Sequence, residues 1–120
     1  MRNMSYALTT QQFCDRVKDV TRRLGWDNLC PGEHYMGVLK AMGLKPGEKI
    51  EPLGECICIS NTPEPLKYII EKPYRDGNTR SEMEREGFPK MSAEEFVDFF
   101  CTHMKVKPET YVNRISFKRV

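Results

Sequence analysis

The run Cys56-Ile57-Cys58-Ile59 constrains the fold most, because it is apolar at every position. Successive side chains of a β-strand point to opposite faces of the sheet, so this run predicts a strand buried on both sides, as in a barrel. We expect the strand to span residues 50–59, and Pro63 and Pro65 to end it. The thiols of Cys56 and Cys58 should then face the same way.

The end of the chain predicts a second strand. Residues 111–118 alternate, with Tyr111, Ile115 and Phe117 on one side and polar side chains on the other, which is typical of a half-buried strand. Three shorter candidates for extended structure are residues 5–8, the β-branched pair at 20–21 and residues 34–40, the last of which fits a short helix equally well.

The clearest helix is predicted for residues 92–105. Ser92 and Glu95 have the spacing of a capping box, and an i, i+3, i+4 stripe of apolar side chains follows. That stripe consists of Phe96, Phe99, Phe100 and Met104. His103, at the far end, is expected to interact with the last carbonyls of the helix.

Shorter helices are predicted on both sides of the central strand. Thr9 and Gln12 also have capping-box spacing, and Phe13 and Val17 would share the buried face of the helix that follows. A helix at 82–87 should end at Gly87, which supplies a left-handed cap. One helical turn within 64–70, with an apolar stripe of Leu66, Ile69 and Ile70, a Pro-Gly turn at 46–47 and a polar loop at 72–81 complete the prediction.

A few short strands separated by two or three helices predict a small α+β domain built around a strongly bent sheet or open β-barrel. The chain has 120 residues, which suits one domain, residues 1–120, with one real core. Hydrophobic residues make up 39% and charged residues 30%, which is an ordinary globular composition.

The five cysteines favour free thiols in a reducing compartment. They lack the C-x-x-C spacing of a zinc site, so we expect no metal there. No apolar run approaches the ~20 residues that span a bilayer, and the N-terminus lacks a signal-peptide pattern. We therefore expect a cytoplasmic protein that does not enter a membrane.

Cations gather near both ends of the chain, although the net charge is only +2. If the two ends meet in space, they would form a basic face able to attract a polyanion. The cations concerned are Arg16, Lys18, Arg22 and Arg23 near the start and Lys105, Lys107, Arg114, Lys118 and Arg119 near the end.

The segment 18–23 combines an amine, a hydroxyl and two guanidinium groups. In an extended segment, Lys18 and Thr21 could act as base and nucleophile, and the arginines could hold a phosphate or a polarised carbonyl. A K-x-x-T-x-R pattern alone also describes a solvated helix end. Glu86, before Gly87-Phe88-Pro89, would by itself be an exposed helix acid.

Taken together, three segments resemble the ASCH domain family, whose β-barrel fold is similar to the PUA domain. The match is to small ASCH-type proteins of bacteriophages and prophages, and it spans nearly the whole chain. The segments are Lys18-x-x-Thr21-x-Arg23, Glu84-Arg85-Glu86-Gly87-Phe88-Pro89 with the following helix, and Val112-Asn113-Arg114-Ile115-Ser116-Phe117. The family carries a glycine two residues before the motif lysine. This chain has Arg16 there, which we expect to restrict the backbone and crowd the cleft.

The resemblance implies a PUA-like open barrel and three kinds of activity. Some small ASCH proteins are amidohydrolases that deacetylate N(4)-acetylcytidine, with residues matching Lys18, Thr21 and Glu86 as proton acceptor, nucleophile and proton donor. This chemistry requires no metal or other cofactor. In an apolar pocket Glu86 could stay protonated, Lys18 could be a neutral base, and Arg23 could orient the substrate or stabilise the oxyanion.

The alternative is an RNA or modified-nucleotide binding module of the PUA-like type. Its cations would contact phosphates, and an aromatic side chain would stack on a base, although a lone tryptophan is more often a core anchor. The candidates are Arg22, Arg23, Arg114, Lys118 and Arg119 for phosphate and Trp26 or Tyr74 for the base. A ribonuclease, the third activity in this group, has little support from His34 and His103, which lie outside the matching segments. The expected partner is thus a nucleoside or RNA.

Overall fold

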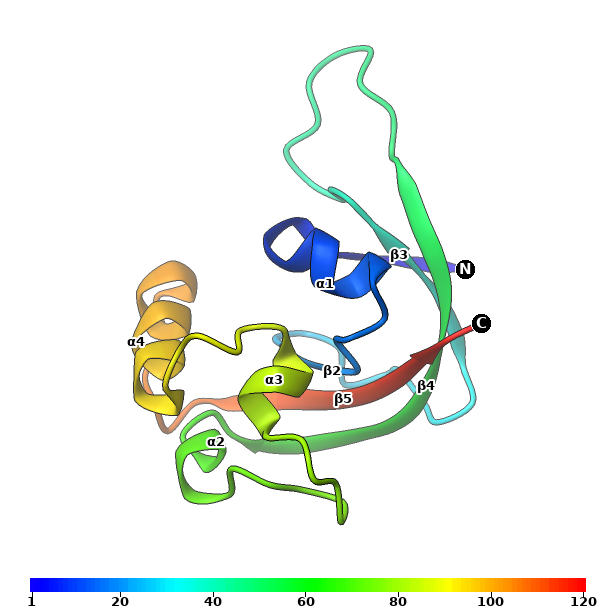
Figure 1. Cartoon of the computed structure of the whole chain (residues 1–120). Coiled ribbons are helices and arrows are strands. Elements are labelled where there is room, and N and C mark those ends of the chain that lie inside the picture. The colour runs from blue at the N-terminus through cyan, green and yellow to red at the C-terminus, as the bar shows by residue number, and fades with distance from the viewer.

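The computed structural model describes residues 1–120, and its five strands form one strongly curled sheet, a half-barrel with four helices around it (Figure 1). In sequence order the elements are β1 (Arg2–Ser5), a 3-10 turn η1 (Ala7–Thr9), α1 (Thr10–Cys14), β2 (Val20–Arg23), β3 (His34–Val38), β4 (Pro52–Pro65), α2 (Tyr68–Glu71), α3 (Glu82–Glu86), α4 (Ala93–Met104) and β5 (Tyr111–Arg119). The strand order is β1-β3-β4-β5-β2, with β1 and β3 parallel and the other pairs antiparallel. The predicted α+β class and bent sheet are confirmed.

β4 is the central strand, and it is longer than predicted. It runs past Pro63, which lies opposite Asn113 of β5. β3 pairs with β4 only as far as Ile57, so the edge near Pro63 has no partner strand and the missing N–H costs no ladder bond. The prediction that Pro63 ends the strand is therefore wrong.

A register shift between Cys58 and Ser60 lets β4 curve. Cys56 and Cys58 are buried on the same face as predicted, but Ile59 is 51% exposed at the irregularity. The expectation of burial on both faces is wrong at that position. A single strand thereby serves two halves of the sheet, β3 along its first part and β5 along its second.

The N-terminal segment differs most from its prediction. The first strand ends at Ser5 instead of beginning there, and Thr9 makes no side-chain capping bond to α1. The helix stops at Cys14 because Arg16 adopts a left-handed backbone with φ 61°. Val17 consequently leaves the helical face and is 46% exposed, whereas Phe13 is fully buried as predicted.

The other helices follow the sequence pattern closely. Ser92 and Glu95 form the predicted capping box of α4, and Gly87 closes α3 with φ 98°. Residues 34–38 form a strand, which settles the alternative left open for that segment. α2 provides the expected turn with Ile69 buried, and the segment 72–81 contains no helix or strand.

β5 is a strand as predicted, but it is buried on both faces. Ile115 and Phe117 point into one core cluster, while Arg114 and Ser116 on the opposite face are also covered. The half-buried pattern is wrong because α3 and the loop before it lie over the polar face and pair with its arginine. Two apolar clusters result, one inside the curled sheet and one joining α2, α3 and α4 to the start of β5. No helix in the structure is long and apolar enough to cross a bilayer.

Candidate active site

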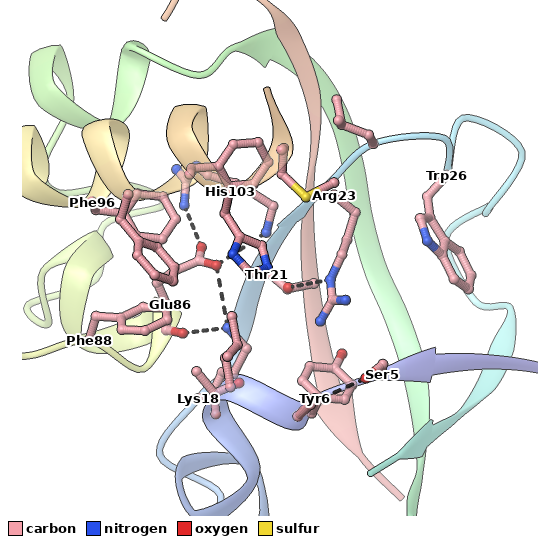
Figure 2. A pocket seen from close by; sticks show the side chains of 18 of the residues that line it. Ser5, Tyr6, Lys18, Thr21, Arg23, Trp26, Glu86, Phe88, Phe96 and His103 are labelled. Carbon is pink, nitrogen blue, oxygen red and sulfur yellow. Dashed lines mark hydrogen bonds and ion pairs between the residues drawn. The ribbon is translucent and has the colours of Figure 1, made fainter. Parts of the chain in front are cut away.

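A cavity of about 480 Å³ opens between β2, the end of α3 and α4 (Figure 2). Its size falls in the range of small-molecule sites. All three residues predicted to be catalytic, Lys18, Thr21 and Glu86, line it, although 65 residues of sequence separate Thr21 from Glu86. One side of the cavity is polar and charged, and the other consists of aromatic side chains from α4 and the segment before it.

Lys18 is almost fully buried at the base of the polar side, just before β2 begins. Its ammonium group donates to the backbone carbonyl of Glu86 and lies 3.4 Å from the Oε1 atom of the same residue. Burial lowers the pKa of Lys18 to about 8, because desolvation outweighs the opposing effect of the Glu86 carboxylate. A minor fraction of the lysine, about one in ten at pH 7, is therefore a neutral amine.

Glu86 was expected to lie in an apolar pocket, but polar donors surround its carboxyl group. Its Oε1 atom accepts a hydrogen bond from the backbone N–H of Arg22 at 3.2 Å, and its Oε2 atom accepts one from the Arg22 guanidinium at 2.9 Å. With Lys18 on the same carboxyl group, donors surround both oxygens, which is the environment of a carboxylate acceptor. Its geometry suits positioning of Lys18, and its role as a proton donor stays a prediction.

A buried layer of ion pairs supports Glu86 from behind. Arg22 and Arg114 lie directly opposite each other on β2 and β5, where like charges would repel. Glu82 lies between them, 2.9 Å from Arg22 and 2.7 Å from Arg114. Burial raises the pKa of Glu82, but the two guanidinium groups together hold it below its usual value. Arg85 and Glu64 also belong to this buried layer, and Asp19, Arg75 and the exposed Asp76 extend it to the surface.

Thr21 and Arg23 lie on the opposite face of β2, since side chains alternate along a strand. Thr21 is buried, and its Oγ1 atom accepts a hydrogen bond from Nε of Arg23 at 2.9 Å. The guanidinium carbon of Arg23 lies 4.9 Å from the centre of the Tyr6 ring. This contact places a cation next to the candidate nucleophile, where it can stabilise developing negative charge.

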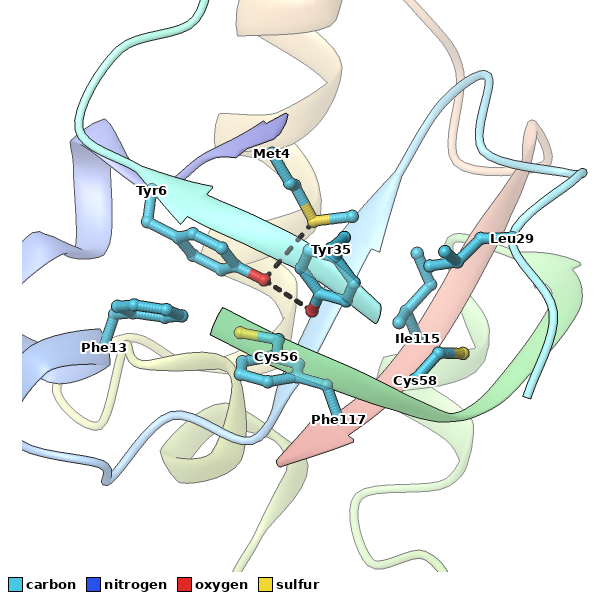
Figure 3. Packing of buried hydrophobic residues seen from close by; sticks show 9 residues of the cluster. All are labelled: Met4, Tyr6, Phe13, Leu29, Tyr35, Cys56, Cys58, Ile115 and Phe117. Carbon is cyan, nitrogen blue, oxygen red and sulfur yellow. Dashed lines mark hydrogen bonds between the residues drawn. The ribbon is translucent and has the colours of Figure 1, made fainter. Parts of the chain in front are cut away.

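The core of the half-barrel holds Tyr6 in place beneath Arg23 (Figure 3). The Tyr6 ring stacks on Phe13 with a centroid distance of 4.3 Å, and its hydroxyl lies 3.0 Å from that of Tyr35. Because both tyrosine rings are buried, this pair is a rigid support for the cavity wall.

The aromatic side of the cavity was read from sequence only as a core stripe. Phe96 is buried, but Phe99 and His103 line the cavity, and their rings stack with a centroid distance of 5.6 Å. Phe88 packs against Phe96 and lines the same wall. The i, i+4 spacing of Phe99 and His103 was the signal for this surface, but nothing in the sequence distinguishes a stripe that packs inward from one that lines a cavity.

The structure divides the predicted binding residues into three groups. Trp26 and Arg23 line the cavity. The backbone N–H of Trp26 donates to the side-chain oxygen of Asn113, and the Asn61 side chain donates to the Trp26 carbonyl, so both ends of this peptide are held. Tyr74 is 61% exposed outside the cavity, and Lys118 is exposed on β5. Neither of these two residues lines the cavity.

Arg22 and Arg114 are buried and ion-paired, so their guanidinium groups are not available to phosphate. Arg119 donates to the carbonyls of Phe13 and Leu53. Together with the burial of Lys18, these contacts withdraw four of the nine cations from the expected basic face.

Arg16 does not crowd the cleft. Its side chain is exposed and does not line the cavity, and the unusual feature is its positive φ of 61°. A left-handed backbone favours glycine, so an arginine at this position is strained. The expected restriction of the backbone is therefore present, but it acts on the turn that delivers Lys18 and not on the cavity.

No family model matches this sequence, and no curated protein matches it. Among solved structures, the fold is similar to protein EF3133 from Enterococcus faecalis V583, of the family DUF984, with a TM-score of 0.58. The match covers 94% of this chain and 70% of that chain at 16% sequence identity. At this identity the likeness concerns the fold alone, a small half-barrel.

Proposed function

We propose that this chain is an amidohydrolase that removes the acyl group from an acylated nucleoside such as N(4)-acetylcytidine. The observation that carries the proposal is the meeting of Lys18, Thr21 and Glu86 at one cavity in which the lysine pKa is lowered to about 8. The resemblance of the three segments to the ASCH family supplies the reaction class.

In the proposed reaction, the neutral amine of Lys18 takes the proton of the Thr21 hydroxyl, directly or through a water. The Oγ atom of Thr21 attacks the acyl carbon, and the carbonyl π electrons move to its oxygen. The Arg23 guanidinium, already bonded to Thr21, stabilises that oxyanion. With a pKa of about 8, about one lysine in ten is neutral at pH 7.

Collapse of the intermediate breaks the bond to the exocyclic amine, which takes the proton from the Lys18 ammonium group. The acyl group is left as an ester on Thr21. A water, deprotonated by Lys18, then hydrolyses the ester and restores the threonine hydroxyl. In this scheme Glu86 keeps the lysine in place through its side-chain and backbone oxygens.

The cavity walls favour a planar, partly polar ligand. Phe99 and His103 offer a stacked pair of rings at one side, and Trp26 lies on another element of the lining. Base stacking on aromatic side chains is worth about 1–3 kcal/mol per base, which is enough to orient a nucleoside.

The test is hydrolysis of N(4)-acetylcytidine by the wild type, Lys18→Ala and Thr21→Val, with Lys90→Ala as control. Lys90 is exposed and lies outside the cavity. We expect a loss of at least a hundredfold in kcat/KM for the first two variants and no change for the control. Circular dichroism establishes that each variant is folded, and turnover that persists in folded Lys18→Ala would overturn the proposal.

A second candidate is a binding module for a modified nucleobase without catalysis. It is favoured by the stacked pair Phe99–His103, which contributes ring surface but none of the proposed chemistry. Nucleoside binding to the wild type that survives in Lys18→Ala, with no turnover in either protein, would favour this alternative.

A further inference from the structure

Arg23 is the only cation lining the cavity that has no carboxylate partner. Lys18 and Arg22 line the same cavity, and both pair with Glu86. Arg22 is also paired with Glu82 at 2.9 Å, and Glu64 lies 3.7 Å away. Arg23 donates only through Nε, to the Thr21 hydroxyl. The positive charge of this wall is therefore not balanced by the protein.

The free end of the Arg23 guanidinium is held in a defined position. Its Nε atom donates to Thr21, and its guanidinium carbon lies 4.9 Å from the centre of the Tyr6 ring, which Phe13 and Tyr35 hold in place. The two Nη atoms form no hydrogen bond with the protein. A planar fork with two free nitrogens matches the two oxygens of a carboxylate or phosphate.

We propose that the site takes an anionic ligand, whose carboxylate or phosphate oxygens bind the outer N–H groups of the two Nη atoms of Arg23. A guanidinium has five N–H donors, so the edge that faces Thr21 remains available to the oxyanion. This inference rests on the proposed function and names its substrate class: a nucleoside amide that carries a negative charge. An anion on Arg23 neutralises the unbalanced charge, and it lies beside the Thr21 hydroxyl because one guanidinium contacts both. The charge can come from the acyl chain, as in the amide of a dicarboxylic acid, or from a phosphate of the nucleotide.

The experiment compares matched pairs of ligands by equilibrium titration of tryptophan fluorescence. Trp26 is the only tryptophan and lines the cavity, so its signal reports binding there. Cytidine 5′-monophosphate against cytidine tests the phosphate source. N(4)-succinylcytidine against N(4)-acetylcytidine, both titrated into Lys18→Ala, tests the carboxylate source without turnover.

We expect the anionic member of at least one pair to bind about tenfold or more tightly than the neutral member, as a charge-assisted bidentate contact allows. Arg23→Gln should reduce that ratio to within about twofold, and Arg23→Lys, which keeps the charge but loses the fork, should retain part of it. The control Arg16→Gln changes an exposed arginine outside the cavity and should leave the ratio as in the wild type.

Equal affinities within both pairs, or a preference that survives Arg23→Gln, would overturn the inference. The titration measures binding and not hydrolysis, so its outcome is separate from that of the turnover experiment. A preference for the anion without turnover would reject the hydrolase and keep the anion site, whereas turnover without preference would do the reverse.

Discussion

Arg22 and Arg23 are neighbours on β2, yet the two faces of this strand surround them with opposite chemistry. Arg22 points into a buried layer in which Glu82, Glu86 and Glu64 lie within 4.0 Å of its guanidinium nitrogens. Arg23 points to the cavity and meets a hydroxyl and an aromatic ring. Of two neighbouring arginines, one is thus part of the buried ion-pair layer and the other has no carboxylate partner.

The contrast shows how the fold keeps a charged cavity stable. Burying an ion is costly unless it has a partner of opposite charge. In the layer behind Glu86, each buried arginine has a carboxylate partner and each buried carboxylate has an arginine partner. Because Arg22 is satisfied there, Glu86 is held in place and in turn holds Lys18. The face of β2 that carries the ion-paired Arg22 therefore supports the opposite face, on which Arg23 has no carboxylate partner.

The largest expected effect on stability comes from removing a carboxylate from the buried ion-pair layer. In Glu82→Gln, two buried guanidinium groups lose the carboxylate that separates them, and the free energy of unfolding should fall by about 3–5 kcal/mol. Urea denaturation measures the loss. Glu84→Gln on the same helix is the control, since Glu84 is exposed, and its effect should stay within about 0.5 kcal/mol. Equal losses in the two variants would contradict a role for the ion-pair layer in stability.

A smaller effect is expected from the lysine where the two faces meet. Lys18 has its pKa lowered by burial from 10.5 to about 8, so between those pH values the unfolded chain binds a proton that the folded chain has released. The free energy of unfolding should therefore rise with pH across this window, by up to about 3 kcal/mol for the full shift. Below pH 8 both states are protonated and the penalty for burying the charge is complete.

Lys18→Met isolates this contribution, because it keeps an apolar stem and removes the titrating group. The unfolding free energy of the wild type minus that of Lys18→Met should rise by up to about 3 kcal/mol between about pH 7.5 and pH 10.5. Denaturant unfolding at several pH values measures it, and the other titrating groups cancel in the comparison. A difference that does not change with pH would show that the amine is not desolvated in the folded protein.

What the sequence could predict was mostly local. The capping box of Ser92 and Glu95 and the left-handed Gly87 depend on residues within a few positions of each other, and both were read correctly. The class of the fold followed from the apolar run at 56–59 and the alternation at 111–118. The grouping of Lys18, Thr21 and Glu86 was expected only from the family resemblance, and their chemical roles stay predictions.

What could not be predicted depends on partners far apart in the chain. Arg22 and Arg114 were read as surface cations because arginine is seldom buried, and their partner Glu82 lies 60 and 32 residues away. No local pattern shows that three such charges will meet beneath a helix. For the same reason the sequence does not show that Arg22 pairs with glutamates while Arg23 has no carboxylate partner.

The smallest expected effect concerns the turn that leads into β2 and touches neither face. Arg16 holds a left-handed backbone with φ 61°, which costs a residue with a Cβ atom about 1–2 kcal/mol relative to glycine. Part of this cost returns as the greater entropy of glycine in the unfolded chain, so Arg16→Gly should stabilise the protein by about 0.5–1 kcal/mol. Arg16→Ala removes the same side chain but keeps the Cβ atom, and its stability should match the wild type.

Thermal denaturation of the three proteins separates the effect of the backbone from that of the charge. An equal gain in stability in both variants would assign the gain to the lost arginine side chain. Because the exposed side chain reaches neither Arg22 nor Arg23, ligand affinity in the cavity should be the same in all three.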